Sequence, residues 1–182
     1  MSILSLWLPI LVSAIAVWIA SALVWMVMPW HKKDFAATAE EEAVRAALRG
    51  NPPGLYTIPH CVDQKAFKDP AIQKKFEEGP LAYITVTPDG MPSMGGKLLG
   101  AFLFYLLVGV CCAYLLTRTG MTESGYLEVF RVSGTVAFLA YGFAYLQESI
   151  WFGRSWGLTM RSGLDALIYS LVTGGVFGWL IA

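Results

Sequence analysis

The sequence is poor in charged residues, which make up only 14% of its 182 positions. In soluble globular proteins about a quarter of the residues are charged, so this composition argues against a soluble domain. The formal net charge is zero. Because no excess of positive charge is available to bind phosphates, we expect no nucleic acid among the partners.

Residues that form metal sites or disulfides are also scarce, with three Cys and two His in the chain. Three Cys are too few for a disulfide framework, and Cys111 and Cys112 lie inside an apolar run, where Cys packs as a small hydrophobic residue. His60 and Cys61 are adjacent, so their side chains point apart in an extended chain. His31 follows the first apolar segment. We therefore predict no metal site and no cofactor.

Catalytic motifs carry no support either. The sequence contains no HExxH, and GRSWG at 153–157, although it matches GxSxG, follows a predicted helix rather than the strand that a nucleophile elbow needs. The stretch PDGMPSMGGK at 88–97 has the look of a phosphate-binding loop. However, position 91 is Met where that motif needs Gly, and Leu98 stands where it needs Ser or Thr. We predict no catalytic residue and interpret 88–97 as a turn that leads into a helix.

Hydrophobic residues, in contrast, account for 56% of the chain and gather in four long segments. Each approaches the roughly 20 residues that a helix needs to cross about 30 Å of hydrocarbon. The first is too long for a secretion signal and lacks a positive start, so we expect it to be retained. The sequence predicts a mainly α, polytopic membrane protein with four transmembrane helices. They run from about Ile3 to Met28, Leu98 to Leu116, Leu127 to Leu146 and Leu164 to Ala182.

The basic residues predict the orientation, because Lys and Arg collect on the cytoplasmic side of short flanks. Arg118 and Arg131 lie on one side of the predicted helices, and the other eleven lie on the opposite side. Both termini are then outside the cytoplasm, and 31–97 is inside it. The eleven are Lys32, Lys33, Arg45, Arg49, Lys65, Lys68, Lys74, Lys75, Lys97, Arg154 and Arg161.

The segment 31–97 is predicted to hold a small α/β element. Thr38 followed by Glu41 has the form of a capping box and predicts a helix over 39–49. Asp69 and Pro70 suit the N-cap and first position of a second helix.

Two short strands complete this element, LYTI at 55–58 and LAYITVT at 81–87. Two strands alone are marginally stable in water, so we expect them to rest on an apolar surface, for which the cytoplasmic end of the helix bundle is the nearest candidate. The predicted organisation is a first transmembrane helix at 1–30, a cytoplasmic α/β cap at 31–97 and three further transmembrane helices at 98–182.

Two spacings predict ion pairs near the ends of the helices. Glu128 and Arg131 are three residues apart, and Arg161 and Asp165 are four apart, so each pair shares one helix face. Their positions favour structural pairing and anchoring over a transport role, since no acid or base falls in the middle of the predicted segments.

The stretch LQESIWFGRSW at 146–156 is predicted to be the cytoplasmic turn between the last two helices. Trp151 and Trp156 suit the headgroup level of the membrane. Glu148 is placed to pair with Arg154 or Arg161. We expect this turn to be the platform on which the cap docks.

Small residues recur every three or four positions on the last two helices. Such faces let helix backbones approach closely, so we expect these helices to pack as a hairpin, or one face to meet a partner subunit. The residues concerned are Ser133, Ala137, Ala140, Ala144, Ser170, Gly174, Gly178 and Ala182.

Three stretches carry a resemblance to a known group of proteins. They are IWFGRSWGLTMRSGLDALIYSLVTGGVFGWL at 150–180, YLEVFRVSGTVAFLAYG at 126–142 and NPPGLYTIP at 51–59. Together they resemble an uncharacterised family of bacterial four-span inner-membrane proteins. The resemblance implies a bacterial inner membrane and the four-span topology, and it implies no activity, cofactor or catalytic residue.

These observations favour a non-enzymatic accessory or scaffolding subunit of a membrane assembly, with other membrane proteins or further copies of the chain as partners. Two alternatives stay open. One is a small oligomeric transporter or channel with Glu128, Arg131, Glu148 and Asp165 along its path. The other is an interfacial enzyme acting on lipids or quinones through Glu148 and Arg154.

Overall fold

The computed structural model describes residues 2–63 and 65–182, which divide into two compact units. One unit contains the residues up to Phe35 together with Ser93–Ala182, and the other is Ala36–Pro92. Each boundary lies five residues inside the predicted cap of 31–97. The first boundary comes later than predicted because residues 29–34 are bonded to the helix bundle.

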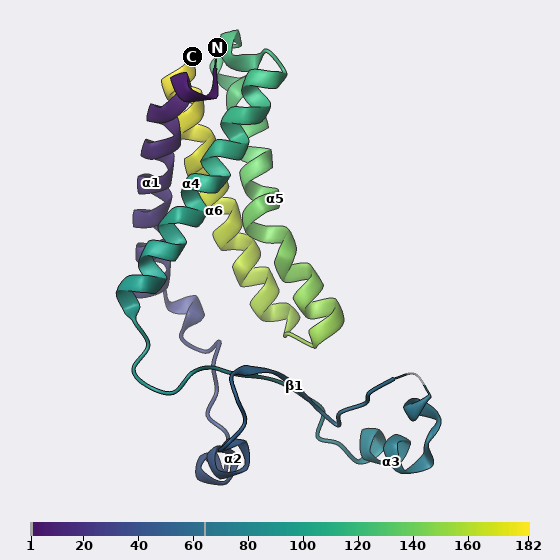
Figure 1. Cartoon of the computed structure of the whole chain (residues 1–182). Coiled ribbons are helices and arrows are strands. Elements are labelled where there is room, and N and C mark those ends of the chain that lie inside the picture. The colour runs from purple at the N-terminus through teal and green to yellow at the C-terminus, as the bar shows by residue number, and fades with distance from the viewer. Residues whose placement is uncertain (1, 64) are drawn as a thin grey trace. The chain divides into compact units, whose positions relative to one another are not determined.

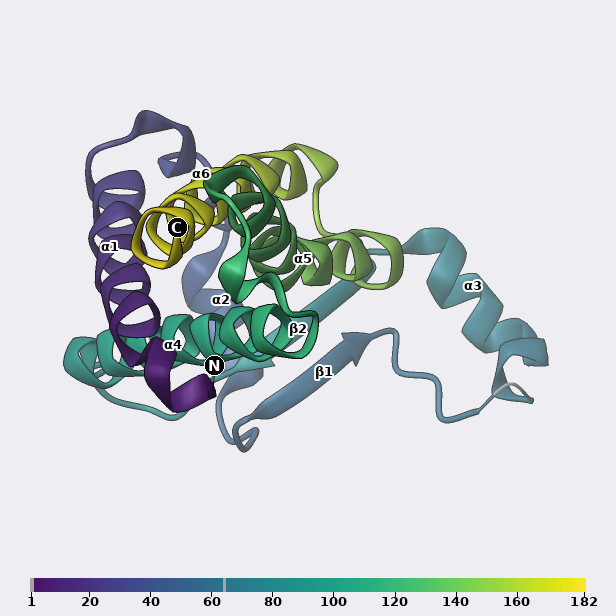
Figure 2. The ribbon, with the colours of Figure 1, turned by 90° about the horizontal axis from the view of Figure 1, so that it is seen from above.

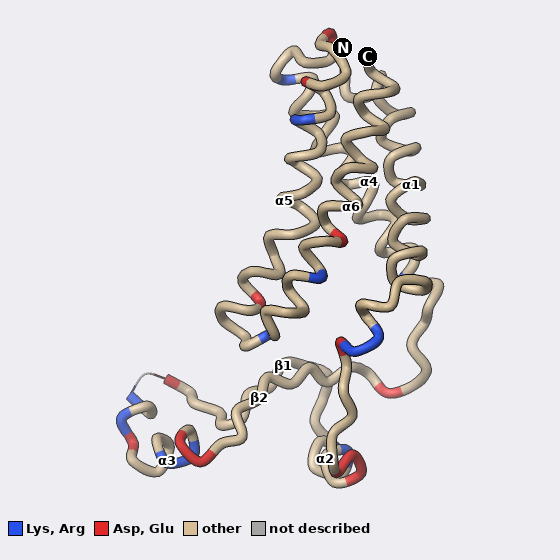
Figure 3. Tube along the Cα trace, turned by 180° about the vertical axis from the view of Figure 1, so that it is seen from behind, with Lys and Arg blue, Asp and Glu red and all other residues tan. Residues whose placement is uncertain are grey.

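The first unit is built on four long helices, α1 (Trp7–Met26), α4 (Met94–Arg118), α5 (Tyr126–Phe152) and α6 (Trp156–Ile181). All four are long and apolar enough to cross a membrane, which confirms the predicted mainly α, polytopic fold. Figure 3 shows how sparse charged residues are along these helices. Both ends of the chain lie at the same end of the bundle (Figure 1).

The helices form a four-membered ring in which α6 packs against α1 and α5, and α4 packs against the same two helices (Figure 2). The contact between α5 and α6 is the closest. A side chain at Gly174 would place its Cβ 3.0 Å from the carbonyl oxygen of Phe130 and 3.2 Å from the Cα of Gly134. These glycines therefore allow the two backbones to touch.

The helices α5 and α6 extend further toward each other than the apolar segments predicted. Only residues 153–155 separate them, so most of the stretch 146–156 is helical rather than a turn. Gly153 ends α5 in the left-handed region at φ 66°, and its N–H and that of Arg154 donate to the carbonyl of Glu148. The hydropathy of the sequence predicted only the apolar middle of each helix. The helices themselves continue at both sides of the turn through polar residues.

The second unit contains α2 (Glu41–Leu48), β1 (Gly54–Ile58), α3 (Pro70–Glu78) and β2 (Ala82–Val86). The two strands pair antiparallel, with Tyr56 opposite Ile84. Asp69 caps α3 as predicted, because its side chain accepts a hydrogen bond of 2.8 Å from the N–H of Ala71. The predicted capping box is wrong: α2 starts at Glu41, and its N-cap is Glu40 rather than Thr38.

Candidate functional site

The chain turns back on the bundle directly after α1. Pro29 begins a short 3-10 helix, η2 (Pro29–His31), because its fixed φ suits a first helical position and it cannot continue α1. The N–H of Asp34 then donates to the carbonyl of His31 at 3.1 Å. This turn presents His31 and Asp34 to the side of α6.

The imidazole of His31 lies between two carboxylates. Its Nδ1 is 2.6 Å from Oδ2 of Asp34, and its Nε2 is 2.8 Å from Oδ2 of Asp165 on α6. His31 and Asp165 are buried, and the side chain of Asp34 is only 1% exposed. A neutral imidazole has one N–H, so both contacts are satisfied as hydrogen bonds when the imidazole carries two protons.

Arg161 completes this group of charges. Its Nε donates to Oδ1 of Asp34 at 2.9 Å, and its Nη2 lies 2.7 Å from the same oxygen as an ion pair. Burial would raise the pKa of Asp34, but hydrogen bonds from His31 and Arg161 and their positive charge outweigh it and lower that pKa below its usual value of 3.8. We call Asp34, His31, Asp165 and Arg161 the histidine network. Two acids face two bases, so a protonated His31 makes the network neutral.

Two tryptophans hold the histidine network in place. The ring of Trp25 stacks on His31 with centroids 4.1 Å apart and an interplanar angle of 6°. The indole N–H of Trp30 donates to Oδ1 of Asp165 at 3.2 Å. The charges of the network are therefore paired, and each carboxylate oxygen has a partner within hydrogen-bond distance.

A cavity of about 170 Å³ adjoins the network at Asp165. Every helix of the bundle contributes to its wall, so it lies within the ring of four helices. We call it the tyrosine cavity. It is lined by Trp25, Phe104, Tyr105, Tyr141, Tyr145, Ser162, Asp165, Ala166 and Tyr169.

The predicted ion pairs are arranged differently in the structure. Arg161 and Asp165 are each bonded to the segment after α1, to Asp34 and His31, rather than to each other. Glu128 and Arg131 are exposed near the start of α5, and the ion pairs found among residues 2–63 and 65–182 do not join them. Glu128 suits its place in the first helical turn, where the helix dipole favours an acid.

Glu148 and Arg154 do not pair through their side chains within the described part of the chain. Glu148 is exposed, and the guanidinium of Arg154 lies 5.1 Å from the centre of the Tyr145 ring. An apolar groove of about 280 Å³ between α5 and α6 is lined by residues that include neither of them. Docking of the cap on this part of the hairpin stays a prediction.

The small residues fall into two groups. Ser133, Ala137, Ser170, Gly174 and Gly178 are buried, whereas Ala140, Ala144 and Ala182 are exposed. The stripe on α5 is therefore buried only along its first half, and its second half faces outward.

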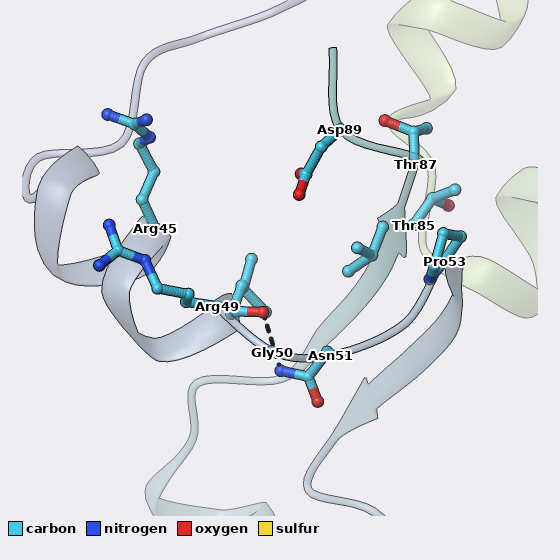
Figure 4. Close-up of a pocket in the computed structure, with 10 residues that line it drawn as sticks. Arg45, Arg49, Gly50, Asn51, Pro53, Thr85, Thr87 and Asp89 are labelled. Carbon is cyan, nitrogen blue, oxygen red and sulfur yellow. Dashed lines mark hydrogen bonds between the residues drawn. The ribbon is translucent and has the colours of Figure 1, made fainter.

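A larger hollow of about 620 Å³ lies in the second unit, between α2 and the strands. Figure 4 shows that the guanidinium groups of Arg45 and Arg49 point away from Asp89 and from the strand residues across the hollow. Arg45 is instead paired with Glu42 at 2.6 Å on the exposed face of α2. No charged groups converge there on a common point, so the histidine network is the stronger candidate site.

His31 and Asp34 were not predicted from the sequence as site residues. The available signal was weak: an acid three residues after a His, beyond the end of an apolar segment. In the described residues no three Cys, His, Asp or Glu side chains are arranged to hold a metal ion. Scans of family models, curated proteins and solved structures find no match to the chain.

Proposed function

We propose that the chain is a non-catalytic accessory or scaffolding subunit of a larger membrane assembly. The observation that carries this proposal is the surface of the Ala36–Pro92 unit. It has defined helices and strands, yet none of its described residues, 36–63 and 65–92, is buried. A folded element without a core needs an apolar surface supplied from elsewhere.

The apolar residues of this unit support the same proposal. Leu55 and Val62 are each 83% exposed, and Leu81 is 61% exposed. An assembly would cover these side chains with another membrane subunit or with a second copy of the chain. Burial of a side chain of this size stabilises a contact by about 1.5–3 kcal/mol.

The bacterial inner membrane is our proposed location, with both termini in the periplasm and 31–97 in the cytoplasm. The distribution of Lys and Arg supports this orientation, since eleven of the thirteen lie on one side. A subunit oriented this way would present the Ala36–Pro92 unit to cytoplasmic partners.

Extraction of the full chain in a mild detergent, followed by mass measurement of the intact complex, tests the proposal. We expect a stable complex with a partner or with further copies. Leu55→Asp should weaken that complex, whereas Thr57→Asp, on the same face of β1, should weaken it less because Thr57 offers little apolar area. A monomer that binds no partner would contradict the proposal.

Transport is a second candidate function, and one observation favours it. Asp165, one of the four ionisable residues considered for a path, lines a cavity inside the helix bundle. Buried ionisable residues in membrane helices commonly mark solute or proton pathways. Solute flux into proteoliposomes that is unchanged by Asp165→Asn would remove this candidate.

A further inference from the structure

The walls of the tyrosine cavity are strongly aromatic. Six of its nine lining residues carry aromatic rings. The rings of Tyr105, Tyr141 and Tyr169, which come from three different helices, lie 5.9 to 6.4 Å apart in tilted or edge-on arrangements. Such rings offer negative faces that attract an organic cation.

Two buried polar groups of the cavity matter for a ligand, the carboxylate of Asp165 and the hydroxyl of Tyr169. Asp165 supplies a carboxylate, and each of its oxygens has one known donor, His31 or Trp30. A carboxylate accepts up to about four hydrogen bonds, so Asp165 has capacity left toward the cavity. The hydroxyl of Tyr169 is buried and makes no hydrogen bond of good geometry within the described chain. Among the described residues Trp25 is the one side chain in reach of this hydroxyl, and an indole N–H can only donate, so the O–H of Tyr169 keeps its own donor capacity toward the cavity.

The charge of the histidine network determines which ligand suits the cavity. With His31 protonated, two negative and two positive groups cancel. When the proton leaves, one negative charge remains uncompensated in a buried place, which is costly. A cation in the adjoining cavity would restore neutrality, so the proton and a cation compete for the same negative charge.

We propose that the tyrosine cavity binds a small organic ammonium ion, which enters in exchange for the proton that His31 holds between Asp34 and Asp165. One proton leaves to solvent for each cation bound, and the net charge of the site stays at zero. At about 170 Å³ the cavity is smaller than the pockets of about 300–1,000 Å³ that hold drug-sized ligands, so the cation is a small one. The inference holds with or without the accessory role proposed above.

The other titratable groups around His31 and Asp165 do not supply this exchange. Arg161 stays charged at any ordinary pH. The tyrosines around Asp165 are Tyr105, Tyr141, Tyr145 and Tyr169. Phenols ordinarily lose their protons only near pH 10. Arg154 lies over the ring of Tyr145 and adds a fixed positive charge nearby.

Titration calorimetry on the full-length protein in mild detergent tests the inference, with choline as the probe. Its neutral isostere 3,3-dimethyl-1-butanol and sodium ions serve as controls. We expect choline to bind, both controls to fail, and choline affinity to rise about tenfold per pH unit while the network is protonated. Buffers of different ionisation enthalpy should show release of about one proton per choline.

Substitutions distinguish a site that recognises the charge of choline from a pocket that binds it through apolar contacts alone. Asp165→Asn should weaken choline binding by about tenfold or more, whereas Glu128→Gln, an exposed acid of the same bundle, should leave it unchanged. His31→Gln removes the competing proton, so choline affinity should no longer rise with pH and choline binding should release no proton. Should Asp165→Asn fail to fold, Tyr105→Leu removes one aromatic wall outside the network and should also weaken binding.

Three results would overturn the inference: equal binding of choline and its isostere, choline binding without proton release, or no choline binding at all. A complete absence of choline binding would mean that water alone fills the cavity. None of them bears on the assembly experiment, which measures complex mass. Failure of the accessory role and failure of the cation site are therefore distinguishable.

Discussion

Asp34 is paired with His31 and Arg161, and its side chain has almost no access to solvent, which makes it sensitive to acid. Its pKa is lower in the folded protein than its usual value of 3.8. A carboxyl whose folded pKa is lowered contributes stability above its unfolded pKa, and that contribution is lost as the pH falls through the folded value. The histidine network should therefore weaken below about pH 4.

Asp34→Asn tests this dependence. We expect the variant to unfold at a lower temperature than the wild type at pH 6, and the difference to shrink as the pH is taken below 4. Thermal unfolding in detergent at several pH values measures it. Glu148→Gln removes an exposed acid and serves as the control, with no comparable difference. A gap between wild type and Asp34→Asn that is the same at pH 6 and pH 3.5 would rule out this role of Asp34.

The sequence identified half of the histidine network and missed its pairing. Arg161 and Asp165 stood out because charges are rare in apolar segments, and their spacing predicted a pair on one helix face. Their actual partners lie 127 and 134 residues away along the chain. Helical periodicity describes neighbours on the same helix only, so contacts with the turn after α1 had no signal of this kind.

The contact between α5 and α6 depends on Gly174. A Cβ there would press on the backbone of α5, at Phe130 and Gly134, which has no flexible end to move aside. We expect Gly174→Ala to destabilise the bundle by about 1–3 kcal/mol, as overpacking does. Unfolding in detergent by circular dichroism measures the change.

Gly175 gives a matched control on the next residue of the same helix. The atom nearest to a Cβ there, the Tyr126 hydroxyl, is 4.0 Å away. Both substitutions raise helix propensity equally, so the difference between them reports the contact alone. Equal stability of the two variants would show that the glycine contact is not what limits the approach of these helices.

The four long helices were predictable because each is a continuous apolar run of membrane length. The ends of these helices were less predictable. The helices α5 and α6 continue through Glu148 and Arg161, since a helix backbone satisfies its own hydrogen bonds whatever its side chains. In the second unit the signal at Asp69 and Pro70 was sufficient for α3, whereas Thr38 lies too far before the first turn of α2 to cap it.

The orientation of the whole molecule can be tested through its native cysteines. Cys61 belongs to the Ala36–Pro92 unit, whereas Cys111 and Cys112 lie within α4. A thiol reagent that cannot cross membranes should label Cys61 in inverted vesicles and leave it unlabelled in intact spheroplasts. Cys61→Ser should abolish the labelling. Labelling of Cys61 in intact spheroplasts would place this unit on the periplasmic side.

The turn after α1 also fixes where the connection to the Ala36–Pro92 unit begins. With His31 and Asp34 bonded to α6, the free connection starts at Phe35 rather than at the end of α1. Release of residues 27–34 would add a flexible length on the order of 16 Å. The volume open to the Ala36–Pro92 unit would grow, and its effective concentration at any fixed binding surface would fall. The histidine network therefore sets the point at which this connection begins, and loss of its buried contacts would lengthen the connection.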